Sequence, residues 1–356
     1  MRELIPLTVP DLGPEEEEAA LAVMRSGMLV QGRRVAAFES SVAKAASREH
    51  GVAVSSGTAA LTVSLQVLGV GLGDEVLVPA MSWPSPAHAV ACLGATPVLV
   101  DVDPDEWNAP ATGYADAIST RTKAAIVIDQ FGNPARGAEI AKVLGEIPIV
   151  EDAACAIGSR FASGAPCGSL GALSTFSFHP RKVLTTGEGG VVVTDNEDFA
   201  QRLRALRNHG QAAPGTFVEA GINLRLTEIA GAIGEVQVRR LEELVQARQT
   251  RAQQIRAALE SVLTFQAVPS GAVANYQTLA ALLPSGKAPE EFIADARALG
   301  VQVGRMSYDL GAIGSLPPAS MPNAAECVRR GIALPLYATM SDEEASHVID
   351  VIQRVL

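Results

Sequence analysis

Apolar runs and amphipathic segments alternate along the first two thirds of the chain. Runs rich in valine, isoleucine and leucine predict buried strands at residues 52–54, 75–78, 96–101, 124–128 and 147–150. Segments with the apolar spacing of helices lie among them, at residues 59–68, 85–93 and 137–144. Strands that alternate with helices favour a mainly parallel sheet covered by helices on both faces, so the pattern predicts an α/β fold.

The pattern changes beyond residue 262, where short strands and a proline-rich loop replace the alternation. The other expected elements are helices at residues 15–25, 33–47, 198–208, 289–299 and 342–355, and strands at 174–178 and 191–194. Residues 227–259 predict one long helix or two broken ones. We therefore expect a large α/β domain over residues 1–245 and a smaller C-terminal α+β domain over residues 246–356.

Composition and charge narrow the class of protein. The chain has 356 residues, 48% of them hydrophobic and 19% charged, which is ample for a large buried core. Its net charge of −11 argues against nucleic acid or an anionic membrane as the main partner. The four cysteines are scattered without the spacing of metal ligands, so we expect reduced thiols and no metal. No apolar run has the length of a membrane span or the pattern of a signal peptide, which predicts a cytoplasmic protein.

One glycine-rich turn holds the most distinctive chemistry. Lys182 lies between the strands expected at residues 174–178 and 191–194, with His179 and Arg181 just before it. A lysine held between two rigid strands can present its amine at a fixed point, and such an amine can form a Schiff base with pyridoxal phosphate. The alternative for a single lysine near glycines is an ordinary surface turn.

Other polar or aromatic residues follow the expected strands at their carboxyl ends, where ligands collect in open α/β sheets. Gly57 and Thr58 directly precede the helix expected at residues 59–68, whose N-terminus can bind a phosphate, although a simple helix cap would have the same sequence. Trp83 can stack on a flat ring or belong to the core. Asp152 can keep the nitrogen of a pyridine ring protonated, and the alternative is that it caps a helix or lies in a surface turn. Together with Lys182, these are the parts of a pyridoxal phosphate site.

The chain also resembles the DegT/DnrJ/EryC1/StrS family of pyridoxal phosphate-dependent sugar aminotransferases, which have the aspartate aminotransferase (type I) fold. The resemblance covers nearly the whole chain and rests on the motifs SSGTAAL, GDEVLVPAMSW, EDAACAIGS, SFHPRKVLTTGEGGVVVT and GINLRLTEIAGAIGEVQVRRL. It implies that Lys182 carries the internal aldimine and that Asp152 meets the pyridine nitrogen. It further implies that the cofactor is held by Gly57, Thr58, Trp83, Ser177 and Asn223, the last across the interface of a homodimer.

Two positions depart from the family pattern, and three further residues are candidates for substrate binding. Cys155 stands where members often have a glutamine that bonds the cofactor's phenolic oxygen, and a thiol is a weaker donor. Asp129 begins a segment in which many members have a histidine. Lys182 itself argues against the related dehydratases, which have a histidine in its place. The candidates for substrate contacts are His179, Arg225 and Tyr308, with a structural role as the alternative for His179.

These observations predict a pyridoxal phosphate-dependent aminotransferase that uses Lys182 in a ping-pong reaction. The resemblance implies that the amino donor is L-glutamate or L-glutamine and that the acceptor is a keto group of a nucleotide-linked sugar. Two alternatives remain at this point: a cyclitol ketone as acceptor, and a non-catalytic regulatory protein that binds pyridoxal phosphate. A nicotinamide-dependent enzyme is disfavoured because no G-x-G-x-x-G sequence follows the first expected strand.

Overall fold

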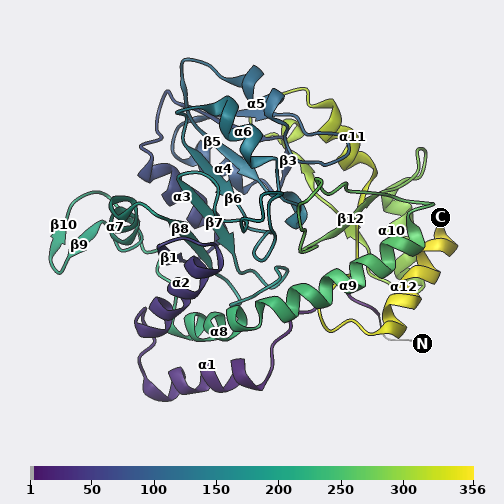
Figure 1. Cartoon of the computed structure of the whole chain (residues 1–356), viewed down its shortest axis with the longest axis horizontal. Helices are drawn as coiled ribbons and strands as arrows, with labels where there is room; N and C mark the ends of the chain where they lie inside the picture. Colours follow the sequence, from purple (N-terminus) through teal and green to yellow (C-terminus); the bar gives the residue numbers. More distant parts are fainter. Residues whose placement is uncertain (1–3) are drawn as a thin grey trace.

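A seven-stranded sheet forms the centre of the molecule, which a computed structural model describes for residues 4–356 (Figure 1). Its strand order is β1-β8-β7-β6-β5-β2-β4, and β8 alone runs against its neighbours. The strands are β1 (His50–Val54), β2 (Glu75–Pro79), β4 (Thr96–Val100), β5 (Thr122–Ile128), β6 (Ile149–Asp152), β7 (Leu173–Ser177) and β8 (Gly190–Thr194). The predicted mainly parallel α/β sheet is therefore confirmed.

Helices cover both faces of this sheet, because successive strand residues point to opposite sides. In β2, Val76 and Val78 pack in one apolar cluster, whereas Leu77 packs in another with Tyr114 and Ile140. The helices of this part of the chain are α1 (Pro14–Ser26), α2 (Arg33–Ala45), α3 (Gly57–Val67), α4 (Ser85–Cys92), α5 (Ala111–Ala117), α6 (Gly137–Leu144), α7 (Glu197–Leu206) and α8 (Glu228–Arg239).

A second, antiparallel sheet lies in the C-terminal part of the chain, with strand order β11-β12-β15-β13. The elements are β11 (Thr264–Phe265), β12 (Leu279–Leu282), β13 (Gly304–Arg305), β15 (Gly331–Leu334), α9 (Leu241–Leu259), α10 (Pro289–Ala298), α11 (Pro322–Arg330) and α12 (Asp342–Val355). The sequence left open whether residues 227–259 form one long helix or two. They form two, because α8 ends just before Arg240 and α9 begins just after it. The expected domain boundary at residue 245 falls inside α9 and stays a prediction.

Two small ribbons and an N-terminal arm connect distant segments. The hairpin of β9 (Gln211–Ala213) and β10 (Thr216–Phe217) projects from the left of the molecule in Figure 1. β3 (Met81–Ser82) pairs with β14 (Tyr308–Asp309) and so joins the two halves of the chain. In the arm, the N–H of Ile5 donates to Gly300 O at 2.9 Å, and Leu7 O accepts from Leu336 N–H at 3.2 Å.

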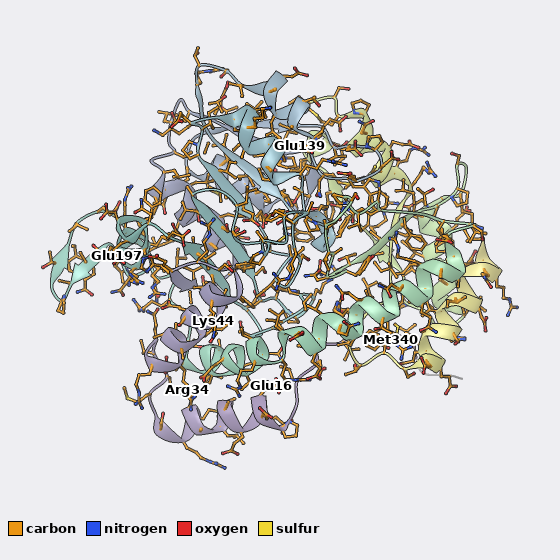
Figure 2. All side chains as sticks on the ribbon, in the orientation of Figure 1. Glu16, Arg34, Lys44, Glu139, Glu197 and Met340 are labelled. Atoms are coloured by element: carbon orange, nitrogen blue, oxygen red, sulfur yellow. The ribbon has the colours of Figure 1, made fainter. Side chains whose placement is uncertain are left out.

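Buried polar contacts fix α1 against α8. Glu16 lies between the two helices, as its label in Figure 2 shows, and is 3% exposed. Its Oε1 accepts hydrogen bonds from Gln237 Nε2 at 2.7 Å and from Arg240 Nη1 at 3.1 Å. A buried carboxylate needs such partners, so these bonds determine the packing of α1. Within residues 4–356, every helix is too short or too polar to cross a lipid bilayer.

Candidate active site

The candidate residues at the carboxyl edge of the large sheet are brought together by strand register. β1 and β7 flank β8, so Val54, Gly190 and Ser177 lie side by side across three strands. One strand further along, Asp152 at the end of β6 is paired with Thr175 of β7. The segments that follow β1, β6 and β7 therefore start from one edge, as expected for a site in an open α/β sheet.

The N-terminus of α3 and the end of β7 form a narrow cradle. Ser56 caps α3 by accepting the N–H of Ala59 at 3.1 Å, and the helix begins at Gly57 and Thr58. A Cβ atom added to Gly57 would lie 2.8 Å from Ser177 Cβ and 3.2 Å from Ser177 Oγ. Only glycine allows this approach. The hydroxyl of Ser177 thus lies beside the free N–H groups of a helix N-terminus, an arrangement suited to a phosphate.

Asp152 is 6% exposed, and its carboxylate is only partly satisfied by the protein. Its Oδ1 accepts the N–H of Ala154 at 3.1 Å. Burial raises the pKa of Asp152, while the Ala154 bond and the nearby charge of Lys182 act in the opposite direction. A buried carboxylate of this kind is stabilised by a cationic donor, which a protonated pyridine nitrogen would provide.

The turn that carries Lys182 is fixed by its own hydrogen bonds. Phe178 O accepts from the Thr185 hydroxyl at 2.9 Å and from the Thr186 N–H at 3.0 Å, which closes the turn at its base. The N–H of Lys182 donates to His179 O at 2.8 Å. At the tip of the side chain, Lys182 Nζ donates to Cys155 Sγ at 3.1 Å. The amine therefore lies beside the loop that follows Asp152.

Trp83 and Tyr308 form a second, more exposed part of the site region. Trp83 follows β3, Tyr308 lies in β14, and Tyr308 is paired with Ser82 across this ribbon. The two rings meet edge to face, with centroids 5.2 Å apart. The side chains are 61% and 47% exposed, respectively. The core alternative for Trp83 is therefore wrong, and its ring is free to contact a ligand.

The remaining candidates lie around the segment before α8 and within the lysine turn. Asn223 is exposed, and its Oδ1 accepts the N–H of Arg225 at 3.3 Å. Arg225 Nη1 donates to Asn208 Oδ1 at 2.5 Å. His179 Nδ1 accepts the N–H of Arg181 at 3.1 Å, a bond that stabilises the lysine turn itself.

Three buried residues near the site were not recognised from the sequence as its supports. Asn275 Nδ2 donates to Cys155 O at 2.9 Å, in the loop after Asp152. Gln277 Nε2 donates to Arg181 O at 2.7 Å, next to Lys182. A carboxylate oxygen of Asp129 lies within 4.8 Å of a carboxylate oxygen of Glu151 and of the Sγ atom of Cys167. Only Asp129 carried a signal, since it departs from the family pattern.

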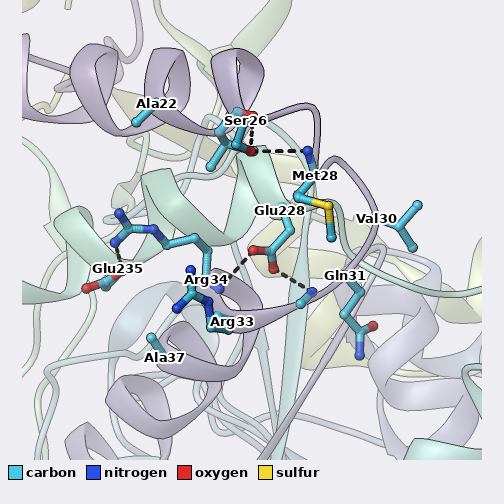
Figure 3. Close-up of a pocket in the computed structure, with 12 residues that line it drawn as sticks. Ala22, Ser26, Met28, Val30, Gln31, Arg33, Arg34, Ala37, Glu228 and Glu235 are labelled. Carbon is cyan, nitrogen blue, oxygen red and sulfur yellow. Dashed lines mark hydrogen bonds and ion pairs between the residues drawn. The ribbon is translucent and has the colours of Figure 1, made fainter.

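A cavity of about 560 Å³ lies at a different place, between α1, α2 and α8 (Figure 3). Met28 and Val30, from the loop between the first two helices, line it. Glu228 holds one wall by accepting the N–H groups of Gly32 at 2.5 Å, Arg34 at 2.9 Å and Val35 at 3.0 Å. The lining includes none of the residues predicted to hold the cofactor, so this cavity is separate from the candidate cofactor site.

The geometry fits pyridoxal phosphate. The cradle at Gly57 and Ser177 suits the phosphate, the buried carboxylate of Asp152 suits a ring nitrogen, and Lys182 supplies an amine beside it. The phosphate cradle would be filled by any side chain at Gly57.

Comparison with known proteins agrees with this fit. The model of the DegT/DnrJ/EryC1/StrS aminotransferase family matches residues 10–353. The aminotransferase TlmJ from Streptoalloteichus hindustanus is 31% identical, with a TM-score of 0.94 over 99% of this chain and 98% of its own. DesV from S. venezuelae, solved with a ketimine intermediate, is 27% identical, with a TM-score of 0.94 over the same shares of the two chains. The putative sugar aminotransferase Spr1654 from Streptococcus pneumoniae, in its PMP form, is 26% identical, with a TM-score of 0.94 over 99% of this chain and 97% of its own.

The match spans nearly the whole chain, and the solved relatives share the entire fold. The chain belongs to the DegT/DnrJ/EryC1/StrS aminotransferase family and is a pyridoxal phosphate-dependent aminotransferase.

Proposed function

We propose that this enzyme transfers an amino group from L-glutamate or L-glutamine to a keto group of a nucleotide-linked sugar. The observation that carries the proposal is the convergence of Lys182, Asp152 and the cradle at Gly57 and Ser177 at one edge of the sheet. The sugar class is supported by the similar protein Spr1654, which is described as a putative sugar aminotransferase.

Each cofactor residue has a separate task in this proposal. Gly57 and Thr58 offer N–H groups, and Ser177 a hydroxyl, to the phosphate. Asp152 would hold the pyridine nitrogen, and the exposed ring of Trp83 would cover a face of the cofactor. Pyridoxal phosphate, when bound, supplies an aldehyde that condenses with amines and a ring that withdraws electrons from the reacting carbon.

Lys182 moves the proton. With the cofactor bound, its amine would take the proton from the α-carbon of the amino donor and return it at C4′, and it would perform the reverse transfer on the keto substrate. The contact with Cys155 Sγ and the closed turn hold the amine near the carboxylate of Asp152. The presence of a lysine at this position favours amino transfer over dehydration.

The substrate contacts are assigned to side chains with free donors near the site. Arg225 has a guanidinium fork that is only partly used by Asn208, which suits an anionic group of the substrate. His179 and Tyr308 are further candidates, Tyr308 because it contacts Trp83. We place Asn223 at the phosphate of a partner subunit in a homodimer, where its exposed amide would be an additional donor.

For the compartment, we propose the cytoplasm, because the exposed free thiol of Cys92 suits a reducing environment.

The visible absorption spectrum tests the proposal most directly. We expect the wild-type protein with pyridoxal phosphate to be yellow and to lose this band when L-glutamate is added, because the amino group moves to the cofactor. Lys182→Ala removes the proton carrier, so its half-reaction should slow by at least about a hundredfold. A wild-type protein that takes up no pyridoxal phosphate would contradict the proposal. A band that responds only to glutamine would change the donor alone.

A panel of acceptors separates the remaining functions. Nucleotide-linked keto-sugars and free cyclitol ketones are offered to the aminated enzyme, and return of the yellow band reports transfer. Turnover with a cyclitol alone would replace the sugar assignment.

A further inference from the structure

A short buried segment of the C-terminal part of the chain, residues 274–278, contacts the loop that follows Asp152 and the turn that carries Lys182. It contributes two amide side chains, Asn275 and Gln277, which are 0% and 8% exposed. Both are buried polar groups, and buried polar groups occupy places defined by their hydrogen bonds. Their partners therefore show what the segment positions.

Asn275 holds the loop that follows Asp152. Its Nδ2 donates to Cys155 O at 2.9 Å and to Ile157 O at 2.8 Å, so one amide group spans three residues of that loop. The backbone N–H of Asn275 also donates to Ser159 Oγ at 3.0 Å. These bonds fix the loop from its third residue after Asp152 onward.

Gln277 holds the turn that carries Lys182. Its Nε2 donates at 2.7 Å to the carbonyl of Arg181, the residue directly before the lysine. The Thr278 hydroxyl donates to Gln277 Oε1 at 2.9 Å, which fixes the orientation of the amide. Asn275 therefore binds the backbone at Cys155, and Gln277 binds the backbone next to Lys182, so the two amides hold the two partners of the contact between Cys155 and Lys182.

The backbone of the segment is itself held from α9. Arg248 Nη2 donates to Tyr276 O at 3.1 Å and to Gln277 O at 2.5 Å, and burial lowers the pKa of this guanidinium to about 10. Gln249 Nε2 donates to Ala274 O at 2.9 Å. Tyr276 has a φ of 51°, a left-handed conformation that a bulky residue keeps only when its surroundings enforce it. Such strain commonly marks a functional constraint.

We propose that Asn275 and Gln277 are positioning residues that set the placement of Lys182 relative to Asp152. The inference rests on the proposed function, in which Asp152 would bind the ring nitrogen and Lys182 would act at the carbon attached to the same rigid ring. An error of about 1 Å in such a placement costs on the order of a hundredfold in rate. The segment therefore links the C-terminal sheet, through β12 directly after it, to the geometry of the reacting groups.

Gln277→Met tests the proposal, because methionine has similar volume and no donor. Three quantities are measured: the rate at which pyridoxal phosphate attaches to Lys182 with release of one water, the half-reaction rate with L-glutamate, and the affinity for 4′-deoxypyridoxine phosphate. That analogue has no aldehyde, so it reports the phosphate and ring contacts alone. We expect both rates to fall about tenfold or more, with the analogue affinity within about twofold of wild type.

Gln266→Met is the matched control. Gln266 is 7% exposed and donates to Glu106 O at 2.7 Å and to Gln130 O at 3.3 Å, bonds of the same kind that do not touch the lysine turn. It should lower the unfolding temperature like Gln277→Met while leaving both rates unchanged. Thr278→Val should slow the rates in the same direction as Gln277→Met, and Thr278→Ser, which keeps the hydroxyl, should restore them.

Two results would overturn the inference by showing that Gln277 does not act specifically on the reacting groups. One is an equal loss of rate in Gln277→Met and Gln266→Met; the other is a fall in analogue affinity as large as the fall in rate. Either would indicate a general structural role. If the wild-type protein attaches no pyridoxal phosphate, the proposed function fails and the inference fails with it. If wild type and Gln277→Met attach it equally fast, the inference alone fails.

Discussion

At the scale of single residues, the pair formed by Asp129 and Glu151 is the least expected feature of the site region. Glu151 accepts bonds from Gly168 N–H, Leu170 N–H and the Ser174 hydroxyl. Asp129 Oδ1 accepts the N–H of Ala135, but Oδ2 has no partner in the described part of the chain. Two buried carboxylates repel each other, so one proton between them would satisfy both.

The pair makes stability depend on pH. Burial, and then the charge of Glu151, raises the pKa of Asp129 well above its usual value. The folded state therefore binds a proton that the unfolded chain releases above about pH 4, so stability falls as pH rises, by up to ~1.4 kcal/mol per pH unit. Asp129→Asn needs no proton. We expect its thermal unfolding midpoint to exceed that of wild type by a margin that grows from pH 5 to pH 8.

Asp195→Asn serves as the control for this experiment. Burial opposes the shift at Asp195, but hydrogen bonds from Arg48 and the N–H of Glu49 outweigh it and lower its pKa. Asp195 is ionised in both the folded and the unfolded state above pH 5. The thermal unfolding midpoint of Asp195→Asn should therefore differ from that of wild type by the same amount at every pH from 5 to 8. If the unfolding midpoint of Asp129→Asn instead follows that of wild type in parallel as pH rises, the pair of Asp129 and Glu151 holds no proton.

At the scale of elements, we predict that the start of α3 determines the affinity for the cofactor. Gly57→Ala would place a methyl group 2.8 Å from Ser177 Cβ, inside the proposed phosphate site. The methyl group would take space proposed for the phosphate. Overlap of this kind costs about 1–3 kcal/mol on binding, and each ~1.4 kcal/mol is a tenfold change in affinity. We expect the Kd for pyridoxal phosphate to rise about tenfold or more in an equilibrium titration.

Gly71→Ala provides the comparison, because a Cβ there would meet no atom within 4 Å. It should bind pyridoxal phosphate as wild type does. Equal affinity in Gly57→Ala and Gly71→Ala would place the phosphate elsewhere.

Elements with a clear pattern were predicted well, and those with mixed signals were not. α6 has the predicted bounds, because its apolar spacing is regular. α5 was missed because Gly113 weakens the helical signal; the Tyr114 hydroxyl, which donates to Ile126 O at 2.8 Å, ties it to the sheet. α11 was missed because it begins at Pro322, within an apparent proline-rich loop, although proline suits a first helical turn.

The same limit applies to the site. Gly57, Asp152 and Lys182 were predicted because each follows a recognisable strand, and strand ends share one edge. Asn275 and Gln277 could not be predicted, because their partners lie 120 and 96 residues away in the sequence. No local pattern indicates which carbonyl a buried amide will find after folding.

At the scale of the whole molecule, several apolar side chains are exposed at two places. Met28 and Val30 are 72% and 70% exposed in the loop after α1, and Phe217 and Ile222 are 63% and 64% exposed in and after the projecting hairpin. Exposed apolar groups of this kind are typical of contacts between subunits. They support the proposed homodimer, which light scattering would detect as twice the chain mass of 37.0 kDa.

A mixture of two defective variants tests whether the subunits share a site. Lys182→Ala removes the amine of one site, and Asn223→Ala removes the donor proposed to reach the partner's phosphate. If the proposal is correct, each mixed dimer contains one site with both residues intact. We therefore expect activity to reappear after the two proteins are unfolded and refolded together. No recovery, with dimers present, would place Lys182 and Asn223 in the same subunit's site.

The N-terminal arm has a consequence for how the protein is made. Leu7 N–H donates to Gln302 Oε1 at 3.2 Å, across 295 residues of sequence. At roughly 5–20 residues per second, a ribosome needs about 15–60 s to make the chain between them. The arm therefore remains without its native neighbours during most of synthesis. Its apolar side chains are exposed to chaperones for that time, and the C-terminal sheet is completed late in translation.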